Sequence, residues 1–320
     1  MKTEFPPGVR SQIIETDAGH DADKTRSGER PSVRFIFDFL VLRAISPVNA
    51  TLAARWVNDR FWFHPQRLPS HPRESEYLQS AGHFSLECAG RPVATYSWGE
   101  GVPVLLVHGW NGRGTQMGAF IEPLVRLGFR VLAFDAPAHG ESPGSHTDFP
   151  QIAGIIEQIA AKHGPLHGII AHSAGCAPSL LALGRTTSAK RVVFISPFAH
   201  FDTPLKWLAH KLRLRPRIVS AQRRLLEAIY GQDLYQTYSP VVMVRDLAVL
   251  GLVIHDRDDK EVSIEEGRLV AARWPRADFV GTHDLGHYRI LRDPAVVQTV
   301  TDFLAAGAEA RPPRRHSQES

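Results

Sequence analysis

Three short segments of this sequence carry the side chains that acyl transfer through a serine requires. Residues 171–175 read Ala-His-Ser-Ala-Gly, residues 255–262 include several carboxylates, and residues 285–287 read Leu-Gly-His. A serine hydroxyl is a weak nucleophile, so it needs a base within hydrogen-bond reach and an acid that orients that base. Serine, acid and histidine follow one another in that order along the chain. The pattern predicts an acyl-transfer site with Ser173 as nucleophile.

Ser173 lies between an apolar, strand-like run at 166–171 and a helix-like run at 174–183. The small residues Ala171, Ala174 and Gly175 let the backbone pack closely around a sharp strand-to-helix turn that exposes the hydroxyl. The segment resembles the nucleophile elbow of the α/β-hydrolase superfamily, in particular its serine esterase, lipase and lysophospholipase-like members. It departs from the common G-x-S-x-G pattern in having Ala171 at the first glycine position. With the acid and base segments, the resemblance covers about residues 84–305.

The acid is predicted at the end of the apolar strand 249–254. Family members commonly place it three residues after a glycine, with an apolar residue three further on. Asp256 stands at that glycine position, so the resemblance selects Asp259, with Asp258 as the alternative. The other charged residues of 255–262 are interpreted as solvated loop charges or turn formers. The cluster lacks the ligand spacing of a calcium-binding loop, so no metal site is expected there.

The base is predicted to be His287, because it follows the last expected strand and Gly286 precedes it. His283 is interpreted as a surface loop residue. By resemblance, the backbone N–H groups of Trp110 and Ala174 form the oxyanion hole, which stabilises negative charge on the substrate carbonyl oxygen. His108 is expected to be structural. Asp135, His139 and Ser142 match another family turn and are expected to fix loop geometry.

Three other interpretations fail on residue type. The glycines of 109–114 have the spacing of a phosphate-binding loop, but the lysine that such a loop needs is absent. Members of the superfamily that cleave carbon–halogen bonds or epoxides carry aspartate at the elbow, where this chain has Ser173. Cys176 is expected to be a small packed residue rather than a second nucleophile.

Short apolar runs alternate with helix-like runs from about residue 82, which predicts a mostly parallel sheet covered by helices on both faces. The strands are expected at 84–87, 93–97, 104–107, 130–134, 168–171, 192–196, 249–254 and 278–280, the first two forming a hairpin. The helices are expected at 117–127, 149–163, 174–183, 265–274 and 294–305. The fold class is therefore α/β, and by resemblance an α/β-hydrolase fold.

Composition divides the chain further. Residues 1–32 and 307–320 are polar or charged and predict a disordered lead and tail. Residues 33–81 predict a helical extension followed by a proline-rich linker. The segment at residues 35–62 is expected to pack on the main domain, with a helix at a membrane surface as the alternative. Residues 82–306 predict the hydrolase domain, with a helical cap insertion at about 202–247, placed over the carboxyl ends of the strands.

The insertion is basic: Lys206, Lys211, Arg213, Arg215, Arg217, Arg223 and Arg224 fall between Pro204 and Leu226 without a carboxylate. This pattern fits a solvated cap face, a peripheral contact with an anionic membrane, or a phosphorylated substrate such as a lysophospholipid or acyl-CoA. A formal charge of +4 gives no argument for nucleic acid. The oligomeric state is left open.

The two cysteines predict no disulfide framework, and no secretory signal or transmembrane helix is visible. A cytoplasmic location is therefore expected, with no cofactor and no metal. The expected activity is hydrolysis of a carboxylic ester or thioester with an acyl or lipid-like acid part, through an acyl-serine intermediate. An acyltransferase with the same residues, and a non-catalytic ligand- or partner-binding protein on the same scaffold, are the alternatives.

Overall fold

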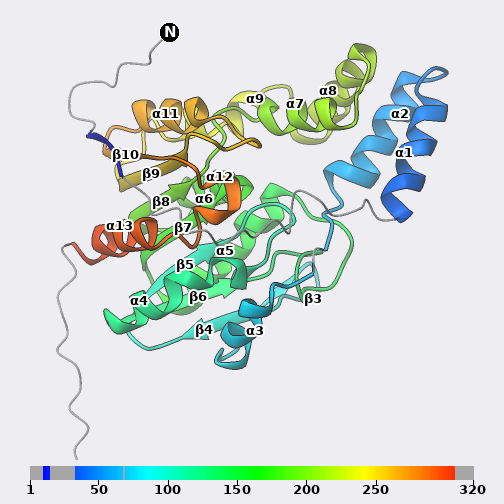
Figure 1. Cartoon of the computed structure of the whole chain (residues 1–320). Coiled ribbons are helices and arrows are strands. Elements are labelled where there is room, and N and C mark those ends of the chain that lie inside the picture. Colours follow the sequence, from blue (N-terminus) through cyan, green and yellow to red (C-terminus); the bar gives the residue numbers. More distant parts are fainter. Residues whose placement is uncertain (1–9, 15–32, 68, 307–320) are drawn as a thin grey trace, which may run out of the picture.

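One large sheet organises the molecule. The computed structural model describes residues 10–14, 33–67 and 69–306. Within these ranges, eight strands form the sheet in the order β1-β10-β9-β8-β7-β5-β6-β4 (Figure 1). Only β4 runs antiparallel to its neighbour, β6. The strands are β1 Ser11–Ile13, β4 Thr95–Trp98, β5 Val102–Val107, β6 Phe129–Phe134, β7 Leu166–His172, β8 Ala189–Ile195, β9 Leu250–Asp256 and β10 Ala277–Thr282.

Both faces of the sheet are apolar and covered. Successive side chains of a strand point to opposite faces, so Leu105 and Val107 join one core and Val104 and Leu106 join the other. The first core is closed by α5 Phe149–His163, α6 Cys176–Leu183, α10 Pro240–Met243 and α11 Ile264–Arg273. The second is closed by η2 Gly114–Phe120, α4 Ile121–Arg126 and α13 Pro294–Ala305. The predicted α/β fold class is confirmed.

The two helices whose bounds the sequence predicted best, α5 and α13, each begin after an aspartate that caps the helix. Helix α5 begins after Asp148, whose carboxylate accepts a hydrogen bond from the N–H of Gln151 at 2.9 Å. Helix α13 begins after Asp293, which caps the N–H of Val296 in the same way at 3.1 Å. Such caps satisfy donors that have no partner inside the helix. Both helices span the residues predicted for them.

Strand β1 corrects the predicted disordered lead. Residues 11–13 pair in parallel with β10, and the N–H of Phe279 donates to the carbonyl of Arg10 at 2.9 Å. The strand has three residues at the sheet edge, so backbone hydrogen bonds rather than an apolar pattern define it. The rest of 1–32, and the tail predicted from residue 307, lie outside the described residues.

The predicted hairpin over residues 84–97 is wrong in extent. Strands β2 Glu87–Cys88 and β3 Arg91–Pro92 form a two-residue hairpin around a turn in which Ala89 and Gly90 have positive φ. Strand β4 joins the large sheet instead. Phe84, expected in a strand, donates its N–H to the side-chain Oγ1 of Thr95 at 3.1 Å, so a side chain replaces a strand partner there.

The predicted linker contains a further helix, α3 Pro72–Gln79. Pro72 is its first residue, a position where the missing N–H of proline costs no helical hydrogen bond. Glu74 of this helix is buried; it accepts a hydrogen bond from Oγ1 of Thr115 at 3.2 Å and pairs with Arg113 at 3.5 Å. Helix α3 therefore belongs to the packed structure.

The N-terminal helices pack on the insertion, away from the large sheet (Figure 1). They are α1 Val33–Ile45, α2 Ala50–Val57 and the π-helical turn η1 Asn58–Trp62. The insertion consists of α7 Asp202–Lys211, α8 Pro216–Tyr230 and α9 Leu234–Thr237, followed by α10. Leu42, Ala54 and Val57 pack against Leu208 and Ile218 in one buried cluster. The helices of the extension thus pack on the insertion, which belongs to the predicted hydrolase domain.

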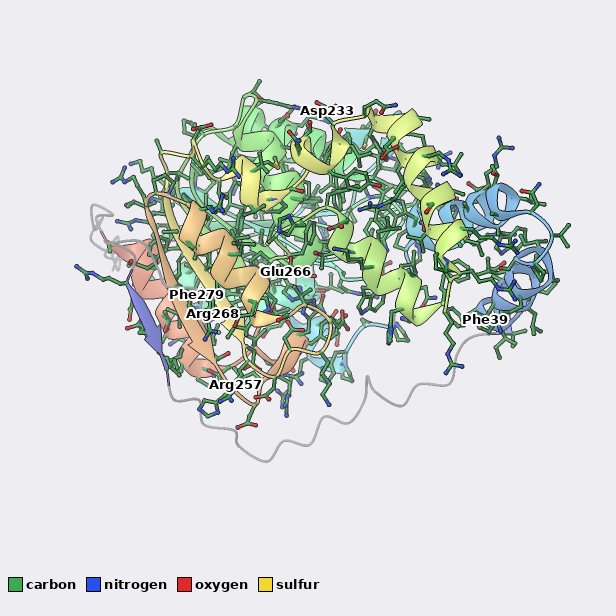
Figure 2. All side chains as sticks on the ribbon, turned by 90° about the horizontal axis from the view of Figure 1, so that it is seen from above. Phe39, Asp233, Arg257, Glu266, Arg268 and Phe279 are labelled. Atoms are coloured by element: carbon green, nitrogen blue, oxygen red, sulfur yellow. The ribbon has the colours of Figure 1, made fainter. Side chains whose placement is uncertain are left out.

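Buried polar contacts fix this arrangement. Gln222 of α8 donates to Oδ1 of Asn58 at 3.0 Å, and both side chains are buried. The start of the insertion is held by Glu266 of α11, which Figure 2 labels; its carboxylate accepts from the N–H of Ala199 at 2.6 Å and from Oγ1 of Thr203 at 3.0 Å. The division into domains stays a prediction. No helix in the described ranges is both long and apolar enough to cross a membrane.

Candidate active site

Ser173 occupies a strained turn between β7 and the 3₁₀ turn η3 Ser173–Gly175, which leads into α6. Its φ is 51°, in the left-handed region that side chains other than glycine rarely adopt. A Cβ on Gly175 would lie 2.6 Å from the carbonyl oxygen of His108, so only glycine fits there. Ala171 is fully buried in the core, where its methyl group is accommodated. The local backbone thus presents the hydroxyl in the way that the sequence predicted.

His287 lies beside Ser173, on the short helix α12 Gly286–Arg289. Its Nε2 is 2.9 Å from Oγ of Ser173. The chain reaches this helix through Asp284 and Gly286, which both have positive φ. His283, by contrast, is exposed and pairs with Asp284. The structure therefore brings the predicted base, and not His283, to the serine.

Asp259 completes the arrangement. Its Oδ2 lies 2.6 Å from Nδ1 of His287, and its Oδ1 accepts hydrogen bonds from the N–H groups of Glu261 and Val262 at 2.8 and 3.0 Å. The carboxylate is fully buried, and burial alone would raise its pKa. Hydrogen bonds from His255, from His287 and from the backbone outweigh burial and hold the pKa of Asp259 well below its usual range.

Asp258, the alternative acid, lies elsewhere. Its side chain accepts a hydrogen bond from the N–H of Asp284 at 2.9 Å, and the residue is exposed. It is therefore Asp259 that the fold brings to the imidazole of His287.

Two residues next to the acid were misjudged from the sequence. His255 and Asp256, interpreted as loop charges or turn formers, are fully buried at the end of β9. Nε2 of His255 lies 2.9 Å from the carbonyl oxygen of Val262 and 3.4 Å from Oδ2 of Asp259, so its N–H is directed at both oxygens. The clue available in the sequence was their direct continuation of the apolar run at 249–254.

Asp256 holds the loop that carries the histidine. Its carboxylate accepts hydrogen bonds from Oγ1 of Thr282 at 2.7 Å and from the N–H of Gly286 at 2.9 Å. Because Gly286 directly precedes His287, these hydrogen bonds fix the position of the imidazole relative to the carboxyl ends of β9 and β10.

His172 also contacts His287. Its Nε2 lies 2.9 Å from the carbonyl oxygen of His287, and the two ring centroids are 4.7 Å apart. Burial, followed by the nearby charge of His287, lowers the pKa of His172 well below its usual range. His172 therefore stays neutral and donates its N–H to that carbonyl.

The predicted oxyanion residues lie on two neighbouring turns, and both line the cavity that contains Ser173. Trp110 follows β5 in a turn closed by a hydrogen bond from the N–H of Gly112 to the carbonyl of Gly109, at 3.0 Å. Ala174 follows the serine. Asn111 has a positive φ, and its side chain accepts a hydrogen bond from the N–H of Gln66 at 2.7 Å. The N-terminal segment is thus tied to the turn that carries Trp110.

Buried polar contacts hold the turn over residues 135–142. The carboxylate of Asp135 accepts hydrogen bonds from the N–H of Gly114 at 2.7 Å and from the hydroxyl of Tyr96 at 2.9 Å. Ser142 donates to the carbonyl of Asp135 at 2.6 Å. His108 accepts from the N–H of Ala136 at 2.9 Å. These contacts fit the structural roles expected for Asp135, Ser142 and His108.

A cavity of about 780 Å³ opens over Ser173. Its walls carry many aromatic side chains and come from three parts of the chain: the N-terminal helices, the insertion and the loops above the sheet. The aromatic lining residues include Phe61, Trp62, Phe149, Phe198, Phe201, Trp207 and Tyr238. The share contributed by residues 35–67 was missed, because no local pattern indicates that an N-terminal helix packs beside an insertion more than 150 residues further along the chain.

A second carboxylate faces the serine side of the imidazole. Oε2 of Glu261 lies 3.7 Å from Nε2 of His287 and accepts a hydrogen bond from the hydroxyl of Tyr288 at 3.2 Å. The side chain of Glu261 is 37 % exposed and lines the cavity. The site therefore places a second carboxylate beside Nε2 of His287.

Comparison with known proteins agrees with this architecture. A family described as "alpha/beta hydrolase fold" matches residues 102–241. The esterase PF2001 of Pyrococcus furiosus superposes with a TM-score of 0.56 at 19% identity, over 76% of this chain and 97% of that one. The family match and the shared fold support a place for this chain in the α/β-hydrolase superfamily.

Two further proteins are similar to this chain. The meta-cleavage product hydrolase of Pseudomonas fluorescens IP01 superposes with a TM-score of 0.54 at 16% identity, covering 71% of this chain and 99% of that one. The uncharacterized protein YqkD of Bacillus subtilis (strain 168) is 25% identical over 220 residues, which are 63% of this chain and 70% of YqkD. The structural matches share the α/β-hydrolase fold with this chain.

In this α/β-hydrolase fold the candidate residues follow the carboxyl ends of four parallel strands: Trp110 after β5, Ser173 after β7, Asp259 after β9 and His287 after β10. Ligands of open α/β sheets bind at this edge. Cys176 is fully buried, and burial raises the pKa of its thiol well above its usual range, as expected for a packed residue. In the part of the chain that the structure describes, no group of three or more His, Cys, Asp or Glu side chains is arranged to hold a metal ion.

Proposed function

We propose that this α/β-hydrolase cleaves a carboxylic ester or thioester through an acyl-serine intermediate. The observation that carries the proposal is the continuous series of contacts from Ser173 Oγ to His287 Nε2, at 2.9 Å, and from His287 Nδ1 to Asp259 Oδ2, at 2.6 Å. Both distances allow a hydrogen bond, and together they let an acid orient a base that faces a serine.

In the first half of the reaction, Oγ of Ser173 attacks the carbonyl carbon while its proton moves to Nε2 of His287. The backbone N–H groups of Trp110 and Ala174 donate to the resulting oxyanion. The bond to the leaving oxygen or sulfur then breaks, and that atom takes the proton from His287. The first product leaves, and the acyl group remains on Ser173.

The second half repeats these steps with water. His287 removes a proton from water as its oxygen attacks the acyl carbon, and the proton then returns to Ser173 as the carboxylic acid departs. The buried Asp259 stays ionised throughout, because its lowered pKa favours the carboxylate form. It holds His287 in the tautomer with hydrogen on Nδ1 and stabilises the imidazolium.

The cavity supports an acyl or aryl group as the acid part of the substrate. Its volume of about 780 Å³ lies in the range of pockets that enclose drug-sized ligands. Aromatic side chains pack edge-to-face within it, such as Trp62 and Phe201 with ring centroids 5.9 Å apart. Aromatic walls bind a substrate most favourably when they bury its apolar surface. Cys88 and Cys176 are free cysteines. The cytoplasmic location stays a prediction.

Hydrolysis of p-nitrophenyl esters from acetyl to palmitoyl, by wild type and by folded Ser173→Ala, tests the proposal. We expect activity in the wild type only, with a chain-length optimum set by the cavity. Equal rates in the two proteins would exclude Ser173 as the nucleophile. Diversion of the acyl group to an added alcohol or amine would favour the acyltransferase alternative, and the absence of turnover across the series would favour a non-catalytic binding protein.

A further inference from the structure

Helix α1 is apolar on two opposite sides. One side, with Phe39 and Leu42, packs into the cluster that α1 and α2 share with α7 and α8. The other side exposes Val33, Ile36, Phe37 and Leu40, whose exposed fractions are 85, 45, 58 and 60 %. These four residues are spaced as i, i+3, i+4 and i+7, so they form one continuous face of the helix, here called the apolar stripe.

Among the side chains of α1 that the structure describes, no charged one lies within the apolar stripe. The carboxylate of α1, Asp38, is turned to the inside, where it is 3 % exposed and pairs with Arg60 at 3.4 Å. A helix that is apolar on both sides is normally buried, and a contiguous exposed apolar face marks a binding surface. The stripe therefore needs an apolar partner.

Arginines lie beside one end of this helix. Arg43, Arg213 and Arg215, here called the basic border, line a hollow of about 250 Å³ between the end of α1 and the α7–α8 turn. All three are exposed, and within the described residues no carboxylate forms an ion pair with any of them. Two other cations of the insertion, Lys206 and Arg223, instead share the carboxylate of Asp202. The basic border thus keeps its charge available for an external anion.

The stripe and the border lie beside the cavity. Phe35 and Asp38 of α1 and Lys211 of α7 line the cavity that contains Ser173, so the helix that carries the stripe also forms a cavity wall. Figure 2 shows Phe39 of α1 at one end of the molecule, with Arg268 and Phe279 towards the other. The apolar face, the cations and one wall of the cavity are therefore gathered at a single end.

We propose that the apolar stripe and the basic border dock this protein on the anionic surface of a phospholipid bilayer. Helices that lie in a membrane interface bury an apolar face at the level of the headgroups, and cations beside that face attract anionic lipids. A second copy of the chain is a poorer occupant of the same face, because its own stripe and border would supply an apolar partner but no anionic one. The membrane supplies apolar and anionic partners at once.

Flotation of the full-length protein with lipid vesicles tests this proposal without using its activity. We expect binding to vesicles of phosphatidylcholine mixed with phosphatidylglycerol, and much weaker binding to phosphatidylcholine alone. Each arginine near an anionic surface strengthens binding by about fivefold, so Arg213→Gln/Arg215→Gln should reduce partitioning by about thirtyfold. Phe37→Ser/Leu40→Ser should reduce it more than about tenfold, on the order of the loss for two half-exposed apolar side chains.

Matched variants at the other end of the molecule serve as controls. Leu127→Ser removes a half-exposed apolar side chain, and Arg245→Gln/Arg273→Gln removes two exposed cations; both should bind as wild type does. Failure of the wild type to bind anionic vesicles would overturn the proposal, as would equal losses in test and control variants. A wild-type dimer in solution that Phe37→Ser/Leu40→Ser converts to a monomer would also overturn it, by assigning the stripe to a second copy.

Discussion

Replacing Asp259 with asparagine should abolish most of the turnover without unfolding the chain. Oδ1 of Asp259 accepts two backbone N–H groups, and Oδ2 faces Nδ1 of His287 at 2.6 Å and Nε2 of His255 at 3.4 Å. In the Asp259→Asn variant the carbonyl oxygen of the new amide must stay with the backbone donors, so its NH₂ group faces both rings. His287 then carries its hydrogen on Nε2 and cannot accept the proton of Ser173.

The size of this effect follows from the tautomer. In serine proteases the same change of orienting acid to amide lowers kcat by about 10⁴-fold, and we expect a loss of that order here. That factor corresponds to about 5.5 kcal/mol of transition-state stabilisation. Asp258→Asn is the matched control: the residue is exposed and bonded to the N–H of Asp284, so kcat should change by no more than about twofold.

The assay is steady-state hydrolysis of the best p-nitrophenyl ester, with circular dichroism to establish that each variant is folded. If Asp258→Asn were the more damaging of the two, or if Asp259→Asn kept more than a tenth of wild-type kcat, the assignment of the acid would be wrong.

The same residue gives a prediction for stability against pH. The pKa of Asp259 is lower in the folded protein than in the unfolded chain, where it is about 3.9. The folded state therefore binds fewer protons, and the stabilising contribution is complete above about pH 4 and lost as pH falls below that value. The difference in free energy of unfolding between wild type and Asp259→Asn should shrink below about pH 4 in denaturant titrations; a difference that grows there would contradict the stated sign.

Three further predictions concern other parts of the site. Gly267→Ala places a Cβ 2.4 Å from Nδ1 of His255, so it should cost about 1–3 kcal/mol of stability and also lower kcat. The control Gly154→Ala lies in open space on α5 and should stabilise the protein by up to about 1 kcal/mol. Equal shifts in Tm for the two variants would refute this. Burial lowers the pKa of His139, so the free energy of unfolding should decrease as pH falls below about 6.5. His139→Asn should reduce the slope of this free energy against pH by at most about 1.4 kcal/mol per pH unit. An unchanged slope would count against the prediction. Glu261→Gln should raise kcat/KM for an ester with an anionic leaving group by about fivefold relative to a neutral one, since a charge at about 4 Å in a water-like medium contributes about 1 kcal/mol; an unchanged ratio would place the leaving group elsewhere.

The sequence was most informative where a local pattern and a buried environment coincide. Strand β7 is buried along its whole length and mostly apolar, and Gly175 is required by the close approach of the carbonyl oxygen of His108, so the position of Ser173 followed from local sequence. Capped helices such as α5 and α13 were placed at their observed bounds for the same reason.

Features that depend on distant partners were missed. Strand β1 exists because its backbone pairs with β10, and helix α3 because Glu74 finds partners in Thr115 and Arg113. The burial of His255 beside Asp259 depends on the glycine at 267 of the following helix. Likewise, only the packing of α2 against α8 brings residues of the N-terminal extension to the cavity, and no short-range periodicity contains that information.

Covalent labelling tests the central claim most directly. The folded wild-type protein would be treated with a serine-directed fluorophosphonate, and the modified peptide identified by mass spectrometry. We expect a single adduct on Ser173, much slower labelling in His287→Ala and none at this position in Ser173→Ala. An adduct on a different serine, or no adduct in folded wild-type protein, would contradict the assignment of Ser173 as an activated nucleophile.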